Sequence, residues 1–202
     1  MSDYIWIPIA GFFVTFYTAW GGGANDCANS FSSAVGSGAI TIKKAVLIAS
    51  IFEFLGVLLM GSHVSNTIRK NVIDIDLFAD EPEQLMFGMF CSCLSAGMWL
   101  MLATYFKWPV STTHTTIGAV LGFGVAAKGW DAVKWTGVAK IVASWFLSPV
   151  ISGILSSIFF VLIRTFIMRK KDSTDRLIKF FPIIITVAMT IYTLFIVYKG
   201  SP

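Results

Sequence analysis

The sequence YIWIPIAGFFVTFYTAWGGGAND, residues 4–26, joins a long apolar run to two polar residues. The run Tyr4–Ala24 contains no charged side chain, and Asn25 and Asp26 follow it directly. An uncharged apolar run of about 20 residues is long enough to cross the ~30 Å hydrocarbon layer of a membrane as an α-helix. This stretch therefore predicts a membrane-spanning helix with a carboxylate near its end.

Similar runs follow along the rest of the chain. The chain of 202 residues is 56% hydrophobic and only 13% charged, which is outside the range of ordinary soluble domains. We expect an all-α polytopic membrane protein with about five to six membrane segments and broken or re-entrant helices, forming a single transmembrane domain over residues 1–202. The further candidate segments are Ala45–Ser62, Leu85–Phe106, Val110–Ala127, Ile141–Ile163 and Phe180–Tyr198.

The charged residues gather in two loops of opposite sign. By the positive-inside rule the basic loop faces the cytoplasm, together with Lys43 and Lys44, and the acidic loop faces the other side. Because the basic residues lie at a membrane border, the net charge of +4 indicates contact with the lipid bilayer and not with nucleic acid. The basic residues are Arg164, Arg169, Lys170, Lys171, Arg176 and Lys179, and the acidic ones are Asp74, Asp76, Asp80, Glu81 and Glu83.

Asp26 is the first candidate site residue. A charge at membrane depth costs about 3 kcal/mol, so we expect this carboxylate to lie in a polar cavity. Asn25 and Asn29 add amide oxygens next to three glycines, and such hard oxygen ligands suit an alkali cation. In the alternative interpretation, Asp26 caps a helix that starts at Cys27 on the membrane surface. The three cysteines have no zinc or disulfide spacing, and we predict no metal site.

Glu53 lies near the middle of its apolar run, where a charge is most costly. It would be neutral when unpaired and charged when a cation arrives, which makes it a candidate for coupling an ion or a proton to transport. The alternative is a buried glutamate that pairs with a lysine or a backbone amide.

The segment PVSTTHTT, residues 109–116, is the second candidate site. We expect irregular backbone here, over residues 108–118, and also over residues 21–38, because both stretches interrupt the apolar helical pattern. A helix that begins at membrane depth directs its free N–H groups and its positive dipole end into a cavity. With hydroxyl donors at Ser111, Thr112 and Thr113, this end would bind a tetrahedral oxyanion such as phosphate or sulfate. Alternatively, the hydroxyls only cap an ordinary helix.

An enzyme is the alternative of a different class. Ser111 and His114 share a helix face at a spacing of three residues, and with Asp26 they could form the triad of an intramembrane hydrolase. The G-x-S-x-G signature of a nucleophile elbow does not occur. We therefore predict no catalytic residues.

Several motifs together resemble the inorganic phosphate transporter family, whose members move phosphate with sodium ions or protons. The resemblance extends over nearly the whole chain and is closest to eukaryotic, fungal-like sodium-coupled members. The motifs are GANDCANSF (23–31), AVGSGAIT (34–41), ASIFEFLG (49–56), VSNTIRKNVIDIDLF (64–78), PVSTTHTTIGAVLG (109–122) and YKGSP (198–202).

The resemblance implies a role for each candidate residue. Asn25 and Asp26, with Asn29 nearby, would bind sodium and contribute to substrate binding, and Glu53 would be needed for transport. Phosphate would bind at Ser111–Thr113. Sodium is then a co-substrate, with the proton as the alternative, and no other cofactor is expected.

Full-length members of the family contain two inverted copies of this motif set, and we find one copy here. The chain resembles the N-terminal repeat, which implies a second repeat or a second copy of the chain as a partner, and the plasma membrane as its location. A non-transporting half that acts as a receptor or an assembly partner through its acidic loop is a further alternative.

Overall fold

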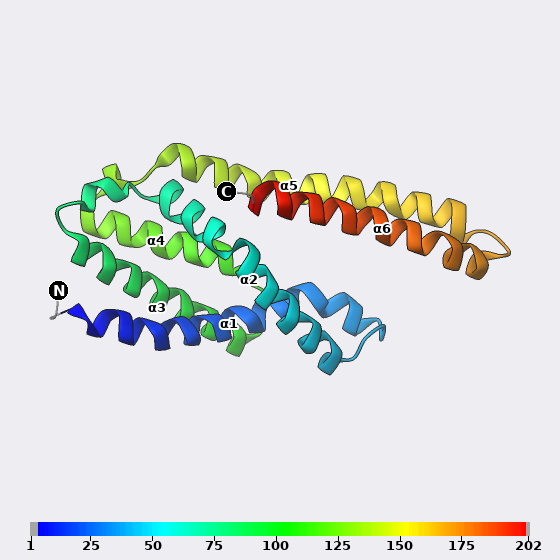
Figure 1. Cartoon of the computed structure of the whole chain (residues 1–202), viewed down its shortest axis with the longest axis horizontal. Helices are drawn as coiled ribbons and strands as arrows, with labels where there is room; N and C mark the ends of the chain where they lie inside the picture. The colour runs from blue at the N-terminus through cyan, green and yellow to red at the C-terminus, as the bar shows by residue number, and fades with distance from the viewer. Residues whose placement is uncertain (1–3, 201–202) are drawn as a thin grey trace. The chain divides into compact units, whose positions relative to one another are not determined.

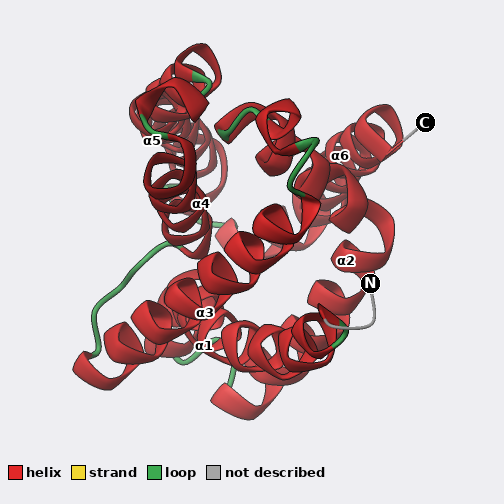
Figure 2. Ribbon diagram, turned by 90° about the vertical axis from the view of Figure 1, so that its left-hand side faces the viewer, coloured by secondary structure: helices red, strands yellow, loops and turns green. Residues whose placement is uncertain are grey.

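The computed structural model describes residues 4–200, except for the side chains of Thr67, Arg69 and Lys199. In this range the chain is almost entirely helical, which confirms the predicted all-α class (Figures 1 and 2). It forms two compact units, residues 1–138 and 139–202. The helices are α1 (Trp6–Gly36), α2 (Ile42–Val72), α3 (Pro82–Phe106), α4 (Thr112–Lys128), α5 (Trp135–Ile163) and α6 (Ser173–Gly200).

Four of these segments are long and apolar enough to cross a membrane: α2, α3, Trp135–Met168 and Ser173–Tyr198. The polytopic membrane class is thereby confirmed. Helix α1 has 31 residues and is long enough to cross a membrane. Its glycines, threonines, tyrosine and tryptophans lower its mean hydropathy. Helix α4 has 17 residues and is shorter than a full crossing.

The backbone of α1 differs from the sequence-based expectation. Residues 21–36, predicted to be irregular, are helical, and the chain first turns at Ser37 and Gly38. Asp26 therefore lies inside α1 and does not cap a helix beginning at Cys27. A glycine costs about 1 kcal/mol in a helix, but Gly21 is buried, and a Cβ there would lie 3.0 Å from Leu100 Cβ. The missing side chain of Gly21 thus permits the close approach of α1 to α3.

The predicted break before α4 is present but shorter than expected. Helix α3 ends at Phe106, Lys107 has a positive φ of 59°, and Ser111 caps α4 by accepting from the His114 N–H at 3.4 Å. At the C-terminal end of α4, Lys128 Nζ lies 3.1 Å from Oε1 of Glu81, the residue that precedes α3. Helix α4 is about 25 Å long. This length separates its N-terminus at Thr112 from the Lys128–Glu81 ion pair.

The loop between α2 and α3 packs against the loop between α4 and α5. The Asp74 N–H donates to the Ala132 carbonyl at 2.8 Å, and Lys134 Nζ lies 3.2 Å from Asp74 Oδ1. Part of the negative charge predicted for this loop is thus paired with lysines of the same unit.

Helices α1 and α3 lie side by side along much of their length (Figures 1 and 2). Gly97 of α3 faces Thr18 of α1, whose Oγ1 donates to the Cys93 carbonyl at 2.9 Å. A Cβ at Gly97 would lie 2.5 Å from Thr18 Oγ1 and 3.2 Å from Thr18 Cα. The missing side chain is what permits this contact.

Gly97→Leu is therefore expected to destabilise the first unit by about 1–3 kcal/mol, because the new side chain must push two helix backbones apart. Gly122→Leu is the matched control, since a Cβ at Gly122 meets nothing within 4 Å. Thermal unfolding in detergent, followed by circular dichroism, measures the difference. Equal melting temperatures for the two variants would contradict the assigned packing.

Candidate functional site

The polar residues Asn25, Asn29 and Asp26 of α1 face different neighbouring elements. Asn25, which is 6% exposed, points its amide nitrogen toward α3. Its Nδ2 donates to Thr104 Oγ1 at 2.8 Å, to the Leu100 carbonyl at 3.3 Å and to the Gly21 carbonyl at 3.0 Å. The NH2 group of Asn25 thus joins α1 to the C-terminal part of α3.

Asn29, one turn further along α1, contacts the connection between α3 and α4. Its Nδ2 donates to the Val110 carbonyl at 3.0 Å, directly before the helix cap at Ser111. Asn25 and Asn29 also line a cavity of about 430 Å³ together with Lys107. Asn29 therefore fixes the start of α4 against α1, and Asn25 fixes α3 against α1, roles that the sequence did not predict.

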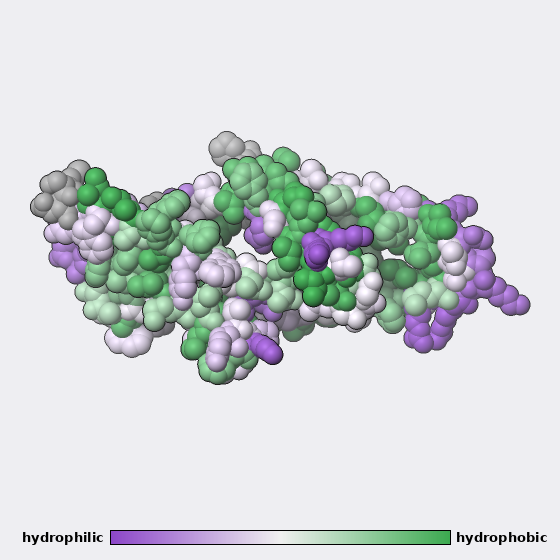
Figure 3. Space-filling model, turned by 90° about the horizontal axis from the view of Figure 1, so that it is seen from below, coloured by the Kyte–Doolittle hydropathy of each residue, from purple (hydrophilic) through white to green (hydrophobic). Residues whose placement is uncertain are grey.

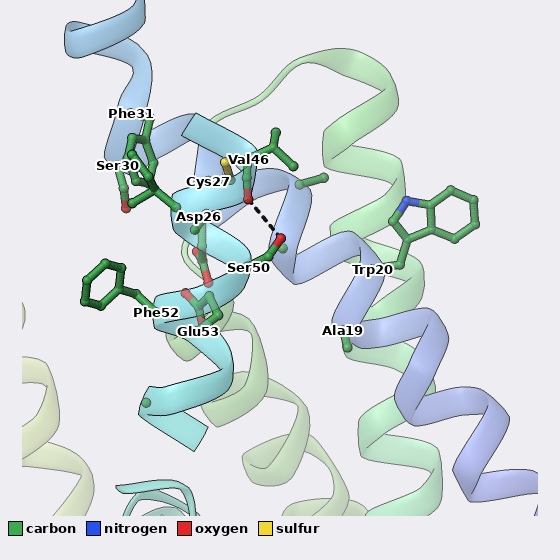
Figure 4. Close-up of a pocket in the computed structure, with 15 residues that line it drawn as sticks. Ala19, Trp20, Asp26, Cys27, Ser30, Phe31, Val46, Ser50, Phe52 and Glu53 are labelled. Carbon is green, nitrogen blue, oxygen red and sulfur yellow. Dashed lines mark hydrogen bonds between the residues drawn. The ribbon is translucent and has the colours of Figure 1, made fainter. Parts of the chain in front are cut away.

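Asp26 instead faces α2, where it lines a cavity of about 720 Å³ together with Glu53. Figure 4 shows the two carboxylates, one from each helix, pointing toward one another. Ser30 and Ser50 add hydroxyl groups to the same lining, and the Ser50 hydroxyl donates to the Val46 carbonyl at 2.8 Å. Sequence reasoning treated Asp26 and Glu53 as separate sites, and the structure brings them together.

The two acidic side chains of this cavity have no basic side chain beside them among the described residues that line it. Its lining residues, all within the described part of the chain, include no lysine, arginine or histidine. Among the described side chains, the ion pairs do not include Glu53, so a lysine partner for it is not found. Two carboxylates that face each other repel, and a small cation between them removes that repulsion. The arrangement therefore suits a monovalent cation with hard oxygen ligands.

The start of α4 packs against α1 one helical turn before Asp26. A Cβ at Gly22 would lie 3.3 Å from Thr112 Cγ2 and 3.5 Å from Thr112 Oγ1. Thr112 Oγ1 is buried, and within the described structure it has no hydrogen-bond partner. A buried hydroxyl without a hydrogen-bond partner destabilises the folded protein by about 1–3 kcal/mol. Hydrogen bonding of Thr112 Oγ1 to a ligand or a water molecule would remove this cost.

The three predicted phosphate ligands have different surroundings. Ser111 Oγ accepts the capping bond from His114, Thr112 is held against Gly22, and Thr113 is exposed. The capping bond also gives Ser111 an ordinary helix-terminal role, unlike the nucleophile of the hydrolase alternative.

The predicted site residues thus form two groups that meet on α1. The lining of the Asp26 and Glu53 cavity does not include Ser111–Thr113. Gly22, which contacts Thr112, and Asp26 are four residues apart and so lie on the same face of α1. Gly22 and Thr104 are site residues that were not predicted from the sequence. The four-residue spacing between Gly22 and Asp26 could have indicated that Gly22 lies on the same helix face as Asp26.

Comparison with known proteins gives concordant results. The model of the phosphate transporter family matches residues 22–202. The mouse protein named sodium-dependent phosphate transporter 1 is 43% identical over 200 residues, which is 99% of this chain and 29% of that protein. A Plasmodium falciparum protein named sodium-dependent phosphate transporter is 41% identical over 198 residues, which is 98% of this chain and 30% of that protein.

A solved structure described as the sodium-dependent phosphate transporter has a similar fold. Its TM-score is 0.80 with 40% sequence identity, and the match covers 85% of this chain and 42% of that one. The chain spans less than a third of the length of the two relatives named above. Because the matched family and the relatives are transporters, the hydrolase alternative is not supported. Since the family model matches nearly the whole sequence from Gly22 onward, this chain belongs to the phosphate transporter family.

Proposed function

We propose that this chain is one half of a sodium-coupled inorganic phosphate symporter, with residues 1–202 forming one membrane domain. The observation that carries the proposal is the cavity in which Asp26 and Glu53 face each other without a basic residue. The names of the relatives, sodium-dependent phosphate transporters, support sodium as the cation and phosphate as the anion. The resemblance to the phosphate transporter family supports the plasma membrane as the location of the protein.

In this proposal sodium binds first. The ion lies at Asp26, with Glu53 as the second carboxylate and coupling residue, and Asn25 and Asn29 contribute to the cation site. Asn29 also holds the start of α4 in place. Phosphate near an unneutralised Asp26 would meet like-charge repulsion in a low dielectric, and a bound cation removes this obstacle. Moving a net positive charge inward also gains about 2.3 kcal/mol per charge for each 100 mV of membrane potential.

Phosphate then binds at the N-terminus of α4, where Ser111, Thr112 and Thr113 lie. The helix end presents unpaired backbone N–H groups and about half a positive charge. The buried Thr112 hydroxyl supplies a donor that is not used elsewhere in the described structure. Binding sodium one turn away along α1 would raise the affinity of this end for an anion.

A second repeat, or a second copy of this chain, completes the transporter in this proposal. The matched part of this chain, 85% of its length, covers 42% of the solved chain, which supports one of two halves. Glu53 is exposed in the middle of an apolar helix, a position that needs a covering partner inside a membrane. Rocking of one half against the other would then give alternating access.

Uptake of radiolabelled phosphate into proteoliposomes tests the coupling ion. Replacing external sodium by choline is expected to lower uptake at least tenfold at neutral pH, because the two carboxylates are left without their cation. Undiminished uptake in choline that increases on acidification would instead support the proton-coupled alternative. If the chain shows uptake only after addition of a separate second repeat, the partner is that repeat and not a second copy.

A further inference from the structure

The tip of the α5–α6 hairpin concentrates the basic charge of the second unit. Residues 164–179 contain six basic and two acidic side chains, so this short stretch alone has the same net charge, +4, as the whole chain. In Figure 3 the hydrophilic colour gathers at this tip, beside the hydrophobic surface of the two helices. The exposed basic residues are Arg164, Arg169, Lys170, Lys171 and Lys179.

The local backbone keeps these side chains close together. Helix α5 passes into a π-helical turn, Arg164–Met168, and the Arg169 N–H closes it by donating to the Arg164 carbonyl at 3.0 Å. Helix α6 begins at Ser173, only a few residues later. The chain therefore reverses over a short tip between two segments that are each apolar enough to cross a membrane.

The two carboxylates at the tip neutralise little of this charge. Asp172 Oδ1 and Oδ2 both accept from Arg176 Nε at 2.9 Å, and this hydrogen bonding holds the pKa of the Asp172 carboxyl below its ordinary value. Among the described side chains, Arg176 is the one member of the cluster in an ion pair. The exposed arginines and lysines thus remain available to an external anion.

Large apolar side chains lie between the basic ones. Phe166 and Met168 are each 60% exposed, and Ile178 is 68% exposed. A small soluble anion would gain nothing from these side chains, whereas the acyl region just below a lipid headgroup would cover them all. Long basic side chains next to a membrane segment extend toward the headgroups while their stems stay in apolar surroundings.

We propose that the α5–α6 tip binds anionic lipid headgroups in the leaflet that it contacts. The phosphate and carboxylate groups of such lipids complement Arg164, Arg169, Lys170 and Lys171, and the neighbouring apolar side chains enter the acyl region. Each basic side chain near an anionic membrane surface raises affinity about fivefold. Several such residues on one tip therefore distinguish an anionic lipid from a zwitterionic one.

The test compares two lysine pairs in the full chain. Lys170→Gln with Lys171→Gln is expected to weaken binding of fluorescent phosphatidylserine to the detergent-solubilised protein about 25-fold. Phosphatidylcholine binding stays unchanged, and Lys170→Arg with Lys171→Arg retains the affinity. The matched control is Lys43→Gln with Lys44→Gln, an exposed adjacent pair in the first turn of the apolar helix α2 and outside the basic cluster, for which we expect less than a threefold effect.

Equal weakening by both lysine pairs would overturn the proposal, because it would show a general effect of basic charge. Displacement of phosphatidylserine by millimolar inorganic phosphate would also overturn it, since the tip would then be a site for a soluble anion. Displacement of phosphatidylserine by a short nucleic acid at the same millimolar concentration would overturn it too, because the tip would then be a nucleic-acid site. Circular dichroism of each variant verifies that the helices are intact.

Discussion

Sodium-dependent phosphate uptake is expected to fall at least 100-fold when Asp26 is replaced by asparagine. The substitution keeps the shape of the side chain but removes one of the two negative charges of the cavity shared with Glu53. Two unit charges about 4 Å apart interact by about 4 kcal/mol at an effective dielectric constant of 20. Even partial loss of that attraction lowers sodium affinity by more than an order of magnitude, and the phosphate step that depends on it is lost as well.

Glu53→Gln supplies the second part of this test. Because both carboxylates line one cavity, their contributions are coupled, and the double variant should lose less than the product of the two single effects. Asp131→Asn, an exposed carboxylate outside the cavity, is the control and should leave uptake unchanged. Strict additivity of the two variants, or full uptake by Asp26→Asn, would show that the two side chains do not bind a common ion.

The membrane class followed from local patterns, because a long apolar segment needs only its own sequence to cross a bilayer. The helix start at Ser111 was also readable, since a cap is a contact between residues three apart. The glycines at Gly21–Gly23 were misleading. Their helix-breaking tendency is intrinsic, but the contact of Gly21 with Leu100 depends on a residue almost eighty positions away, and that contact decides the conformation.

The meeting of Asp26 with Glu53 could not be derived from local patterns. Both lie on helices, α1 and α2, whose relative rotation sets whether the side chains face each other, and no short motif encodes that rotation. The asparagines show a related limit. An amide suits a cation ligand as well as an interhelical hydrogen bond, so only the structure shows that Asn25 Nδ2 contacts Thr104. Sodium binding by Asn25 and Asn29 stays a prediction.

Thr112→Val is expected to weaken phosphate binding about 10- to 100-fold while leaving the protein as stable as before, or slightly more stable. Valine has nearly the same shape, so the contact with Gly22 is kept, and only the hydroxyl is lost. In the described structure this hydroxyl is buried and unpartnered, so its removal costs no internal hydrogen bond. A hydrogen bond to a charged ligand contributes about 1.5–3 kcal/mol, which sets the expected loss of affinity.

The combination of the two readouts separates a ligand-binding hydroxyl from a structural one. Thr116→Val, one turn further along α4, removes a hydroxyl that donates to the Thr112 carbonyl at 2.9 Å, and it should change phosphate affinity by less than threefold. Thr112→Ser should keep most of the affinity, because the donor remains. Equilibrium binding of radiolabelled phosphate and thermal unfolding are measured on the same assembly that shows sodium-dependent uptake. If Thr112→Val lowers the melting temperature and leaves the phosphate Kd unchanged, the hydroxyl interacts with the protein through a bridging water, and phosphate binds elsewhere.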